Sequence, residues 1–397
     1  MKNRWFRALV LAAGALAAGW ATAASAQDGK KEIVFGFSAS LTGKFATEAT
    51  DLKHGYQLWA DEVNRAGGIS VKGQKLPVRL VEYDDASDAN AAIRNYERLI
   101  TRDNVDFILS PWGSGHNFAI SAIAEKYKYP SVLATAAADR IFERKFKYIF
   151  AATQVASSFY EALGDYLETV KGEIKTVGIA YENFLFTQSL HDHLLKKLAA
   201  VGVKVVADEQ YPLGGQDFTA LLTKMKAANP DAFIAINIMP SSVYLTRQMA
   251  EVGFKPKLYA VNIGPMYAQE FIGQLGKSAE RVVENGFWHP ALPYKGAQAF
   301  YDEFEKRYKK PPSTDATYAY IAGTIMQQAI EKAGTLDREK VADMLRTGKF
   351  DTILGDYEFD DRGVNKDQLS FITQVQNGRR VVVWPKSVSS SSIQLPY

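Results

Sequence analysis

Residues that could carry out catalysis are sparse in this sequence. It contains no cysteine, and its five histidines are His54, His116, His191, His193 and His289. His191 and His193 lie two residues apart within a predicted helix, so their side chains point to different faces and make a poor metal clamp. The sequence has no HExxH, GxSxG or GxxxxGK[ST] motif, and no GxGxxG after a predicted strand. We therefore expect no metal site, no cofactor and no catalytic centre built on these motifs.

One pair of carboxylates could act as acid and base. Asp84 and Asp85 end a predicted strand, and two neighbouring carboxyl groups can divide acid and base roles between them. No partner motif accompanies the pair, so we favour the interpretation that it caps the next helix or lines a lobe interface. A hydrolase that uses Asp84 and Asp85 is a minor alternative.

Two segments have the composition of ligand-binding loops. Residues 110–117 (SPWGSGHN) join a predicted strand to a helix that begins at Ser114. The first turn of a helix has unpaired N–H groups that favour an anion, and Ser114 can either cap the helix or donate to a carboxylate. Residues 135–139 (TAAAD) follow the next strand. Their small side chains either let backbone amides approach a ligand or pack a tight corner.

These segments require a scaffold in which strands and helices alternate. In a first series, we predict strands over 33–37, 76–83, 105–109 and 131–134, with helices over 51–66, 88–102 and 114–127. In a second series, we predict helices over 156–170, 187–201, 217–228 and 241–252, with strands over 176–181, 203–209, 232–237 and 258–262. Such repeats predict an α/β fold of two doubly wound parallel-sheet lobes. Ligands of these sheets bind at the carboxyl ends of the strands, where both loop segments lie.

The N-terminus has the three parts of a secretory signal. Basic residues occur within the first seven positions, an apolar run covers 8–20, and Ala24-Ser25-Ala26 predicts a cut before Gln27. The apolar run is too short to cross a hydrocarbon core of about 30 Å. No cysteine at the cut provides a lipid anchor, so we expect a freely diffusing periplasmic protein.

Charge and length narrow the classes of partner and fold. The chain has 47 Lys and Arg against 44 Asp and Glu, and the predicted signal carries three of the basic residues and none of the acidic ones. The remaining charges balance, which argues against a nucleic-acid groove or a polybasic membrane patch. About 370 residues without a disulfide need large apolar cores, and that length predicts two domains.

The order of these features resembles the branched-chain amino-acid binding protein family, the type I periplasmic binding proteins of ABC importers. The resemblance covers residues 31–385. Besides the helix at Ser114 and the turn over 135–137, the motifs that carry it are residues 40–43 (SLTG), 64–69 (NRAGGI), 81–86 (VEYDDA), 217–221 (DFTAL) and 247–253 (RQMAEVG).

The resemblance implies two lobes joined by three crossings near 153, 286 and 356. Lobe 1 would contain residues 31–152 and 287–355, and lobe 2 would contain residues 153–286 and 356–385. A loose tail over 386–397 would follow. The ligand would lie between the lobes, and closure would bury it.

Four matched positions concern the ligand carboxylate. Ser114 matches a serine that holds this group in the family, and Thr135, Ala136 and Ala137 match the loop whose backbone assists it. Around them, Trp112, Phe118, Phe184, Met239 and Tyr267 are expected wall residues. Phe186 matches an aromatic residue of lobe 2 that covers the ligand.

The matched position for the ligand ammonium departs from the family pattern. Asn262 is neutral where the amino-acid binders have an acid, and Glu48 replaces an aromatic residue in the first loop of lobe 1. Burying an ammonium without an anion is costly. Either another carboxylate, namely Glu48, Glu182 or Asp85, binds the ammonium, or the ligand has none.

We therefore expect a receptor without enzymatic activity. It would capture a small hydrophobic carboxylate, such as an amino acid or an aromatic acid, by closure of its lobes. It would act as a monomer and deliver the ligand to an ABC permease in the inner membrane. A ligand-sensing module for a signalling partner is the alternative.

Overall fold

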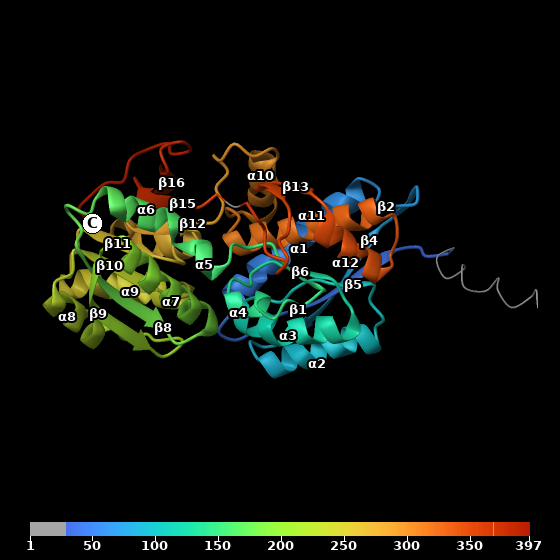
Figure 1. Cartoon of the computed structure of the whole chain (residues 1–397), viewed down its shortest axis with the longest axis horizontal. Coiled ribbons are helices and arrows are strands. Elements are labelled where there is room, and N and C mark those ends of the chain that lie inside the picture. Colours follow the sequence, from blue (N-terminus) through green and yellow to red (C-terminus); the bar gives the residue numbers. More distant parts are fainter. Residues whose placement is uncertain (1–28, 368) are drawn as a thin grey trace, which may run out of the picture.

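The computed structural model describes residues 29–367 and 369–397 and has a lobe at each end (Figure 1). The predicted signal over 1–26 lies outside the described residues. In these two ranges, no helix is long and apolar enough to cross a membrane.

The first lobe contains short parallel sheets. β1 (Ile33–Ala39) lies between β4 (Val78–Asp84) and β5 (Phe107–Ile108), while β6 (Ser131–Leu133) pairs with β7 (Ile149–Ala151). Two hairpins accompany them, formed by β2 (Ile69–Val71) with β3 (Gln74–Leu76) and by β13 (Phe350–Thr352) with β14 (Gly355–Tyr357). The helices of this lobe are α1 (Ala46–Arg65), α2 (Ala89–Thr101), α3 (Ser114–Tyr127), α4 (Asp139–Phe142), α10 (Ala297–Tyr308), α11 (Thr314–Ala333) and α12 (Arg338–Thr347).

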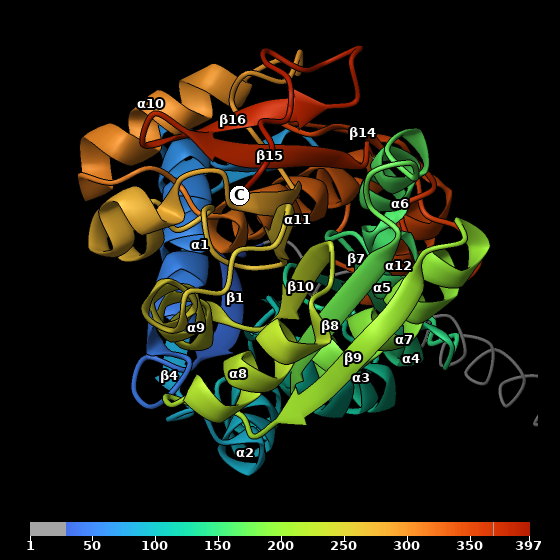
Figure 2. The ribbon, with the colours of Figure 1, turned by 90° about the vertical axis from the view of Figure 1, so that its left-hand side faces the viewer.

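The second lobe has one seven-stranded sheet, with strand order β16-β15-β12-β11-β10-β8-β9. These strands are β8 (Thr176–Glu182), β9 (Lys204–Tyr211), β10 (Ala232–Ile236), β11 (Leu258–Val261), β12 (Val283–Gly286), β15 (Phe371–Gln376) and β16 (Arg379–Trp384). Figure 2 shows β10, β8 and β9 of this sheet side by side. The helical elements are α5 (Ala156–Phe159), α6 (Glu161–Thr169), α7 (Leu185–Ala200), α8 (Thr219–Ala228), α9 (Met239–Val252), η1 (Gln269–Gly273) and η2 (Gly276–Ala279).

The predicted α/β fold with parallel sheets is confirmed. Central strands such as β10 are buried at every position, as a sheet covered on both faces requires. The sheet also has an antiparallel edge that we did not predict, formed by β15 and β16. Asn377 and Gly378 join these strands with φ values of 54° and 70°, which suit a two-residue hairpin turn.

Close packing of α1 on α11 sets the position of both helix N-termini. A Cβ at Gly55 would lie 2.1 Å from the Ala316 carbonyl oxygen, and one at Gly323 would lie 2.3 Å from the Trp59 ring. Both positions therefore require glycine. Because the contacts advance along both helices in the same direction, α1 and α11 run parallel, and their first turns lie at the same end.

Two predicted helices have different boundaries in the structure. The helix predicted over 51–66 begins at Ala46, so Glu48 belongs to the first turn of α1 and not to a loop. The helix predicted over 156–170 is divided at Tyr160 into α5 and α6.

The tail over 386–397 has no helix or strand, and it contacts the sheet of the second lobe. Polar side chains on β15 hold this segment: Gln376 Nε2 donates to the Ser392 carbonyl at 2.8 Å, and Gln374 Nε2 donates to the Gln394 carbonyl at 3.0 Å. The Tyr397 ring packs edge-on against a buried tyrosine of the sheet. The prediction relied on the serine-rich composition of the tail, which does not reveal these distant partners.

Residues just beyond the predicted third crossing still contact the first lobe. The Tyr357 hydroxyl donates to the Ala152 carbonyl at 2.8 Å, and Val364 forms a β-bridge with Ala151. β15 then enters the sheet of the second lobe at Phe371. We propose the two-lobe division given above with its third crossing after Val364 instead of near 356.

Candidate ligand-binding site

Loops at the carboxyl ends of strands from both lobes contact one another. Tyr267, which follows β11, donates its hydroxyl to Asp315 in the first turn of α11. Phe184, which follows β8, has its ring centroid 5.6 Å from that of Phe45, in the segment after β1. The second contact joins loops that follow strands of both lobes, and the first joins such a loop to the start of α11.

Ser114 links two of the predicted loops. It is fully buried at the start of α3, and its Oγ accepts hydrogen bonds from Ala137 N at 3.1 Å and Ala138 N at 3.2 Å. Thr135 Oγ1 accepts from Gly113 N at 3.0 Å in the same place. The Ser114 oxygen is therefore an acceptor for the loop over 135–138, which leaves its proton available for an anion.

Ala136 differs from its neighbours in this loop. It is fully buried and packs in a hydrophobic cluster of the first lobe. Its side chain therefore fills core, and only its backbone can take part in binding.

The aromatic contact between the lobes involves Phe184 and not Phe186. The Trp112 and Phe184 rings are nearly parallel, with centroids 6.4 Å apart. An ideal Cβ on Gly115 would lie 3.4 Å from Phe184, so small residues in the first loop make room for this ring. Phe186 packs edge-on against Phe159 within the second lobe, 6.3 Å between centroids.

Asn262 is part of the loop structure of the second lobe. It is fully buried, and its Oδ1 accepts from Asn237 N at 2.6 Å. Its Nδ2 has no hydrogen-bond partner among the described residues. Asn262 therefore presents a donor, which suits an ammonium poorly. Met239 is buried as the first residue of α9.

Glu182 is a buried carboxylate whose oxygens are satisfied. Its Oε1 accepts from Gly214 N and Ser241 Oγ, both at 2.7 Å, and its Oε2 accepts from Ile238 N at 3.0 Å. Burial raises the pKa of Glu182, and these three donors act in the opposite direction. Glu182 thus joins the loops that follow β8, β9 and β10.

Glu48 contrasts with Glu182. It is fully buried, and neither carboxylate oxygen has a hydrogen-bond partner among the described residues. Burial raises the pKa of Glu48 to about 8; the backbone N–H groups of Glu48 and Met239 oppose this, and the Asp315 charge adds to it. Because Met239 begins α9, Glu48 lies where the two lobes meet.

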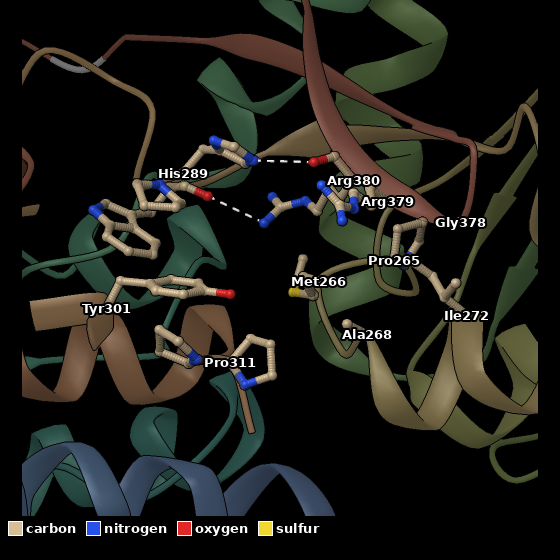
Figure 3. A pocket seen from close by; sticks show the side chains of 13 residues that line it. Pro265, Met266, Ala268, Ile272, His289, Tyr301, Pro311, Gly378, Arg379 and Arg380 are labelled. Carbon is tan, nitrogen blue, oxygen red and sulfur yellow. Dashed lines mark hydrogen bonds between the residues drawn. The ribbon is translucent and has the colours of Figure 1, made fainter. Parts of the chain in front are cut away.

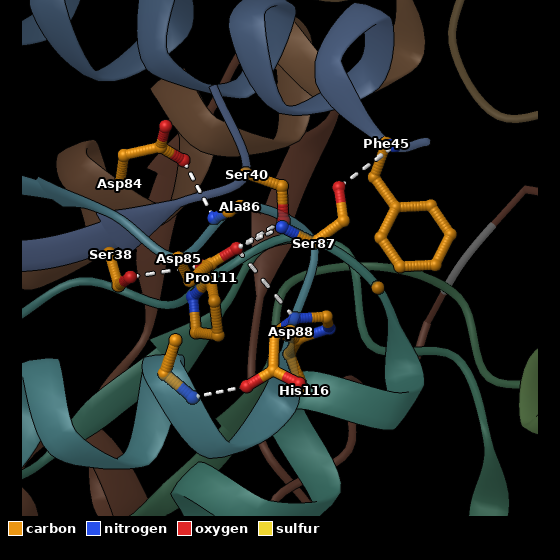
Figure 4. A network of polar contacts seen from close by, with 12 residues as sticks. Ser38, Ser40, Phe45, Asp84, Asp85, Ala86, Ser87, Asp88, Pro111 and His116 are labelled. Carbon is orange, nitrogen blue, oxygen red and sulfur yellow. Dashed lines mark hydrogen bonds and ion pairs between the residues drawn. The ribbon is translucent and has the colours of Figure 1, made fainter. Parts of the chain in front are cut away.

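Asp84 and Asp85 hold loops together (Figure 4). Asp85 accepts from the Ser38 and Ser40 hydroxyls at 2.9 and 2.5 Å. Asp84 accepts from a threonine hydroxyl and three backbone N–H groups nearby. His116 lies 3.8 Å from Asp85, and burial lowers the pKa of this histidine. The bonds of the pair join the loops after β1 and β4, which fits a structural role.

Asp315 is a site residue that was not predicted from the sequence. Its Oδ2 accepts from Trp112 Nε1 at 3.1 Å and also from the Tyr267 hydroxyl. Burial raises the pKa of Asp315 to about 7. The only signal in the sequence is an acid in the first turn of a predicted helix, and such acids are common on exposed helices.

A histidine–aspartate contact between the lobes was also not predicted. His193 Nε2 on α7 lies 3.2 Å from Asp139 Oδ2 on α4. Nothing in the sequence connects these positions, because the contact depends on how the lobes meet.

A separate hollow of about 380 Å³ lies beside the residues that follow β12 and the turn between β15 and β16 (Figure 3). None of the ligand or wall residues predicted from the sequence lines it. Two of its polar side chains make contacts: Arg380 Nε lies 2.8 Å from Glu284, and His289 bonds to the Arg380 carbonyl at 3.1 Å. Burial, and then the Arg380 charge, lower the pKa of His289 to about 4. The remaining lining residues include Pro265, Met266, Trp288 and Tyr301.

Metal binding finds no support in the described ranges. Across residues 29–367 and 369–397, no three side chains of His, Cys, Asp or Glu gather in a way that could hold an ion. The arrangement between the lobes instead combines apolar rings, a hydroxyl proton at Ser114 and two carboxylates, Glu48 and Asp315. These groups suit a small molecule with both apolar and polar parts.

Residues 32–380 match a family model described as periplasmic binding protein. A relative from Pseudomonas aeruginosa, the leucine-, isoleucine-, valine-, threonine-, and alanine-binding protein, is 26% identical over 370 residues. The match covers 91% of this chain and 94% of that protein.

Two solved structures are similar to the whole fold. The branched-chain amino acid transporter substrate binding protein LivJ from Streptococcus pneumoniae, in complex with isoleucine, has a TM-score of 0.79 at 24% identity, covering 89% of this chain and 100% of that one. An ABC transporter solute binding protein from R. palustris, in complex with benzoate, has a TM-score of 0.79 at 18% identity, covering 91% and 98%. At these identities the likeness concerns the fold.

Proposed function

The chain belongs to the periplasmic binding protein family, and on that premise we propose that it is the solute-binding component of an ABC importer. Family membership confirms the resemblance seen in the sequence and the expectation of a solute-binding protein that is not an enzyme. The proposed ligand is a small hydrophobic carboxylate such as an amino acid, captured by closure of the two lobes.

The arrangement around Ser114 carries this proposal. The start of α3 offers unpaired N–H groups and a free hydroxyl proton, which suit a carboxylate. Trp112 and Phe184, one from each lobe, provide apolar surface beside it. A ligand that touches both lobes would stabilise the form in which they meet, because it has more contacts there than in a separated form.

Location and partner follow from the same proposal. The signal over 1–26 would direct the protein to the periplasm and be removed there. The closed protein, as a monomer, would present a surface shared by both lobes to a permease in the inner membrane. A strain that lacks this protein should then lose uptake of its ligand, and restored expression should return it.

A ligand screen tests the proposal directly. The purified protein from Gln27 onward should gain thermal stability with at least one of the amino acids or aromatic acids. A ligand at 100 times its Kd stabilises by about 2.7 kcal/mol, which is easily measured. Failure of the whole panel to shift the melting temperature, together with no heat of binding, would contradict a solute receptor for this class.

An aromatic acid without an ammonium is the second candidate. The cluster of Phe45, Trp112 and Phe184 rings at the lobe contact favours it, and the benzoate complex named above gives a precedent within the fold. Direct competition between benzoate and phenylalanine would separate the two candidates.

A further inference from the structure

Glu48 is the most unusual polar group between the lobes. Its side chain is fully buried, and both of its oxygens lack a hydrogen-bond partner among the described residues. A buried carboxyl group without partners is strongly unfavourable, and native proteins normally pair such groups. A helix N-terminus favours an acid in the first turn of α1, but this does not explain the burial, because exposed acids gain the same benefit.

The acidic side chains around Glu48 make the binding of a cation beside it more favourable. Its close charged neighbours are Asp315, on α11, and Asp51, on α1. Lys310 lies 2.5 Å from Asp51, so that carboxylate already has a cation. Over the two described ranges, no lysine, arginine or histidine nitrogen lies within 4.0 Å of the Glu48 or Asp315 carboxylate.

The other groups considered for the ammonium are already engaged. Glu182 accepts three hydrogen bonds that join loops of the second lobe. Asp85 accepts from two serine hydroxyls and a backbone N–H. The side-chain oxygen of Asn262 accepts from a backbone N–H. Glu48 alone of the three carboxylates has both oxygens free.

We propose that the ligand carries an ammonium group and that Glu48, assisted by Asp315, binds it at the meeting point of α1, α11 and α9. This inference rests on the proposed function and names its ligand class as zwitterionic amino acids. The cation site then lies in the first lobe, at the Glu48 position, and replaces a site in the second lobe at Asn262. Ser114 holds the carboxylate of the same ligand.

Binding then has a proton balance that can be measured. Without ligand, Glu48 is mostly protonated at pH 7, since burial holds its pKa at about 8. An arriving ammonium, already charged, favours the ionised carboxylate. The Glu48 proton leaves to the buffer as the ion pair forms, so binding at pH 7 releases up to one proton, and any share from Asp315 adds to it.

The experiment uses ligands that differ only in the ammonium. Each amino acid that shifts the melting temperature is compared with its deaminated acid, for example leucine with 4-methylpentanoate and phenylalanine with 3-phenylpropanoate. Calorimetry in buffers of different ionisation enthalpy gives the affinity and the protons released. The proteins are wild type, Glu48→Gln, Asp315→Asn and the control Glu168→Gln, an exposed position on α6.

We expect wild type to bind the amino acid more tightly than its deaminated acid and to release protons. Glu48→Gln should weaken amino-acid binding roughly 10- to 150-fold, the range for one charge-assisted hydrogen bond. It should also abolish most of the proton release and leave the deaminated acid unaffected or tighter. Glu168→Gln should behave as wild type.

Two results would overturn the inference in different ways. Equal or tighter binding of the deaminated acid by wild type, without proton release, would mean that protonated Glu48 donates to an anion, while the proposed function would stand. Absence of binding by every amino acid and acid would refute both. The proton measurement on wild type decides the matter even if Glu48→Gln fails to fold, and Asp315→Asn offers an independent variant.

Discussion

Glu182 and Glu48 are both fully buried glutamates close to the contact between the lobes, yet their surroundings are opposite. Glu182 accepts three hydrogen bonds from loops of its own lobe. Glu48 accepts none from the described residues. Burial of an acid alone therefore does not identify a binding group. The acid whose oxygens are satisfied supports the loops, and the acid whose oxygens are free is the one that a ligand can satisfy.

The largest effect should come from removal of the satisfied acid. Glu182→Ala leaves Gly214 N, Ile238 N and Ser241 Oγ buried without their acceptor, so we expect a loss of about 3–5 kcal/mol in the free energy of unfolding. Urea denaturation of the ligand-free protein measures this loss. Near-wild-type stability would show that water replaces Glu182 and would remove the contrast with Glu48.

The unsatisfied acid should instead make stability depend on pH. The pKa of Glu48 is about 8 in the folded protein against 4.5 for an ordinary glutamate. The folded state therefore keeps a proton that the unfolded chain releases, and its stabilising effect is complete below pH 4.5 and lost as pH rises towards 8. Between pH 5 and 7.5, wild type should lose about 3 kcal/mol relative to Glu48→Gln.

Urea unfolding at several pH values, without ligand, measures this difference. Comparison with Glu48→Gln is needed because Asp315, with a pKa raised to about 7, acts in the same direction in both proteins. Parallel stability curves for the two proteins would mean that Glu48 has a partner that lowers its pKa.

Removal of the Ser114 hydroxyl should act mainly on affinity. Ser114→Ala removes one hydrogen bond to the ligand carboxylate, so we expect binding to weaken by about 1.5–3 kcal/mol. It also leaves Ala137 N and Ala138 N without their acceptor, so a smaller loss of stability should accompany it. Calorimetry checks the affinity, and an unchanged Kd would limit Ser114 to holding the loop over 135–138.

The smallest effect should come from a partly exposed contact between a histidine and an aspartate. His193 and Asp139 join the lobes, but 26% of the His193 side chain remains accessible. Such pairs contribute about 0.2–1 kcal/mol, so His193→Gln should weaken ligand binding less than about sixfold. The difference should shrink in about 0.5 M salt. A loss above tenfold would mean that this pair is central to closure.

The fold could be predicted because apolar periodicity and glycine positions are local signals. Strands and helices of both lobes follow from them, and so does the placement of loops at the strand ends. The hairpin of β15 and β16 was missed although Asn377-Gly378 indicates its turn. The contacts of the tail could not be predicted, because its hydrogen bonds come from Gln374 and Gln376, which its composition does not reveal.

The site could be predicted only in part, because its contacts join segments far apart in the sequence. Ser114 and the turn over 135–137 do lie together, as two adjacent strand ends require. The sequence placed both Phe184 and Phe186 around the ligand, and the structure shows that the ring of Phe184 meets aromatic rings of the first lobe. Asp315 belongs to the site only because α11 packs parallel to α1, and no local pattern expresses that packing.

The contact between Trp112 and Phe184 gives the protein an optical signal of its own. Trp112 is nearly buried, and its ring lies nearly parallel to that of Phe184 in the second lobe. Its Nε1 donates to Asp315, which also accepts from Tyr267 of the second lobe. Separation of the lobes would expose the indole to water and shift its emission to longer wavelength. Ligand titrations could therefore be followed by intrinsic fluorescence, without a dye or an introduced cysteine, and Trp112→Phe would identify the share of the signal that reports closure.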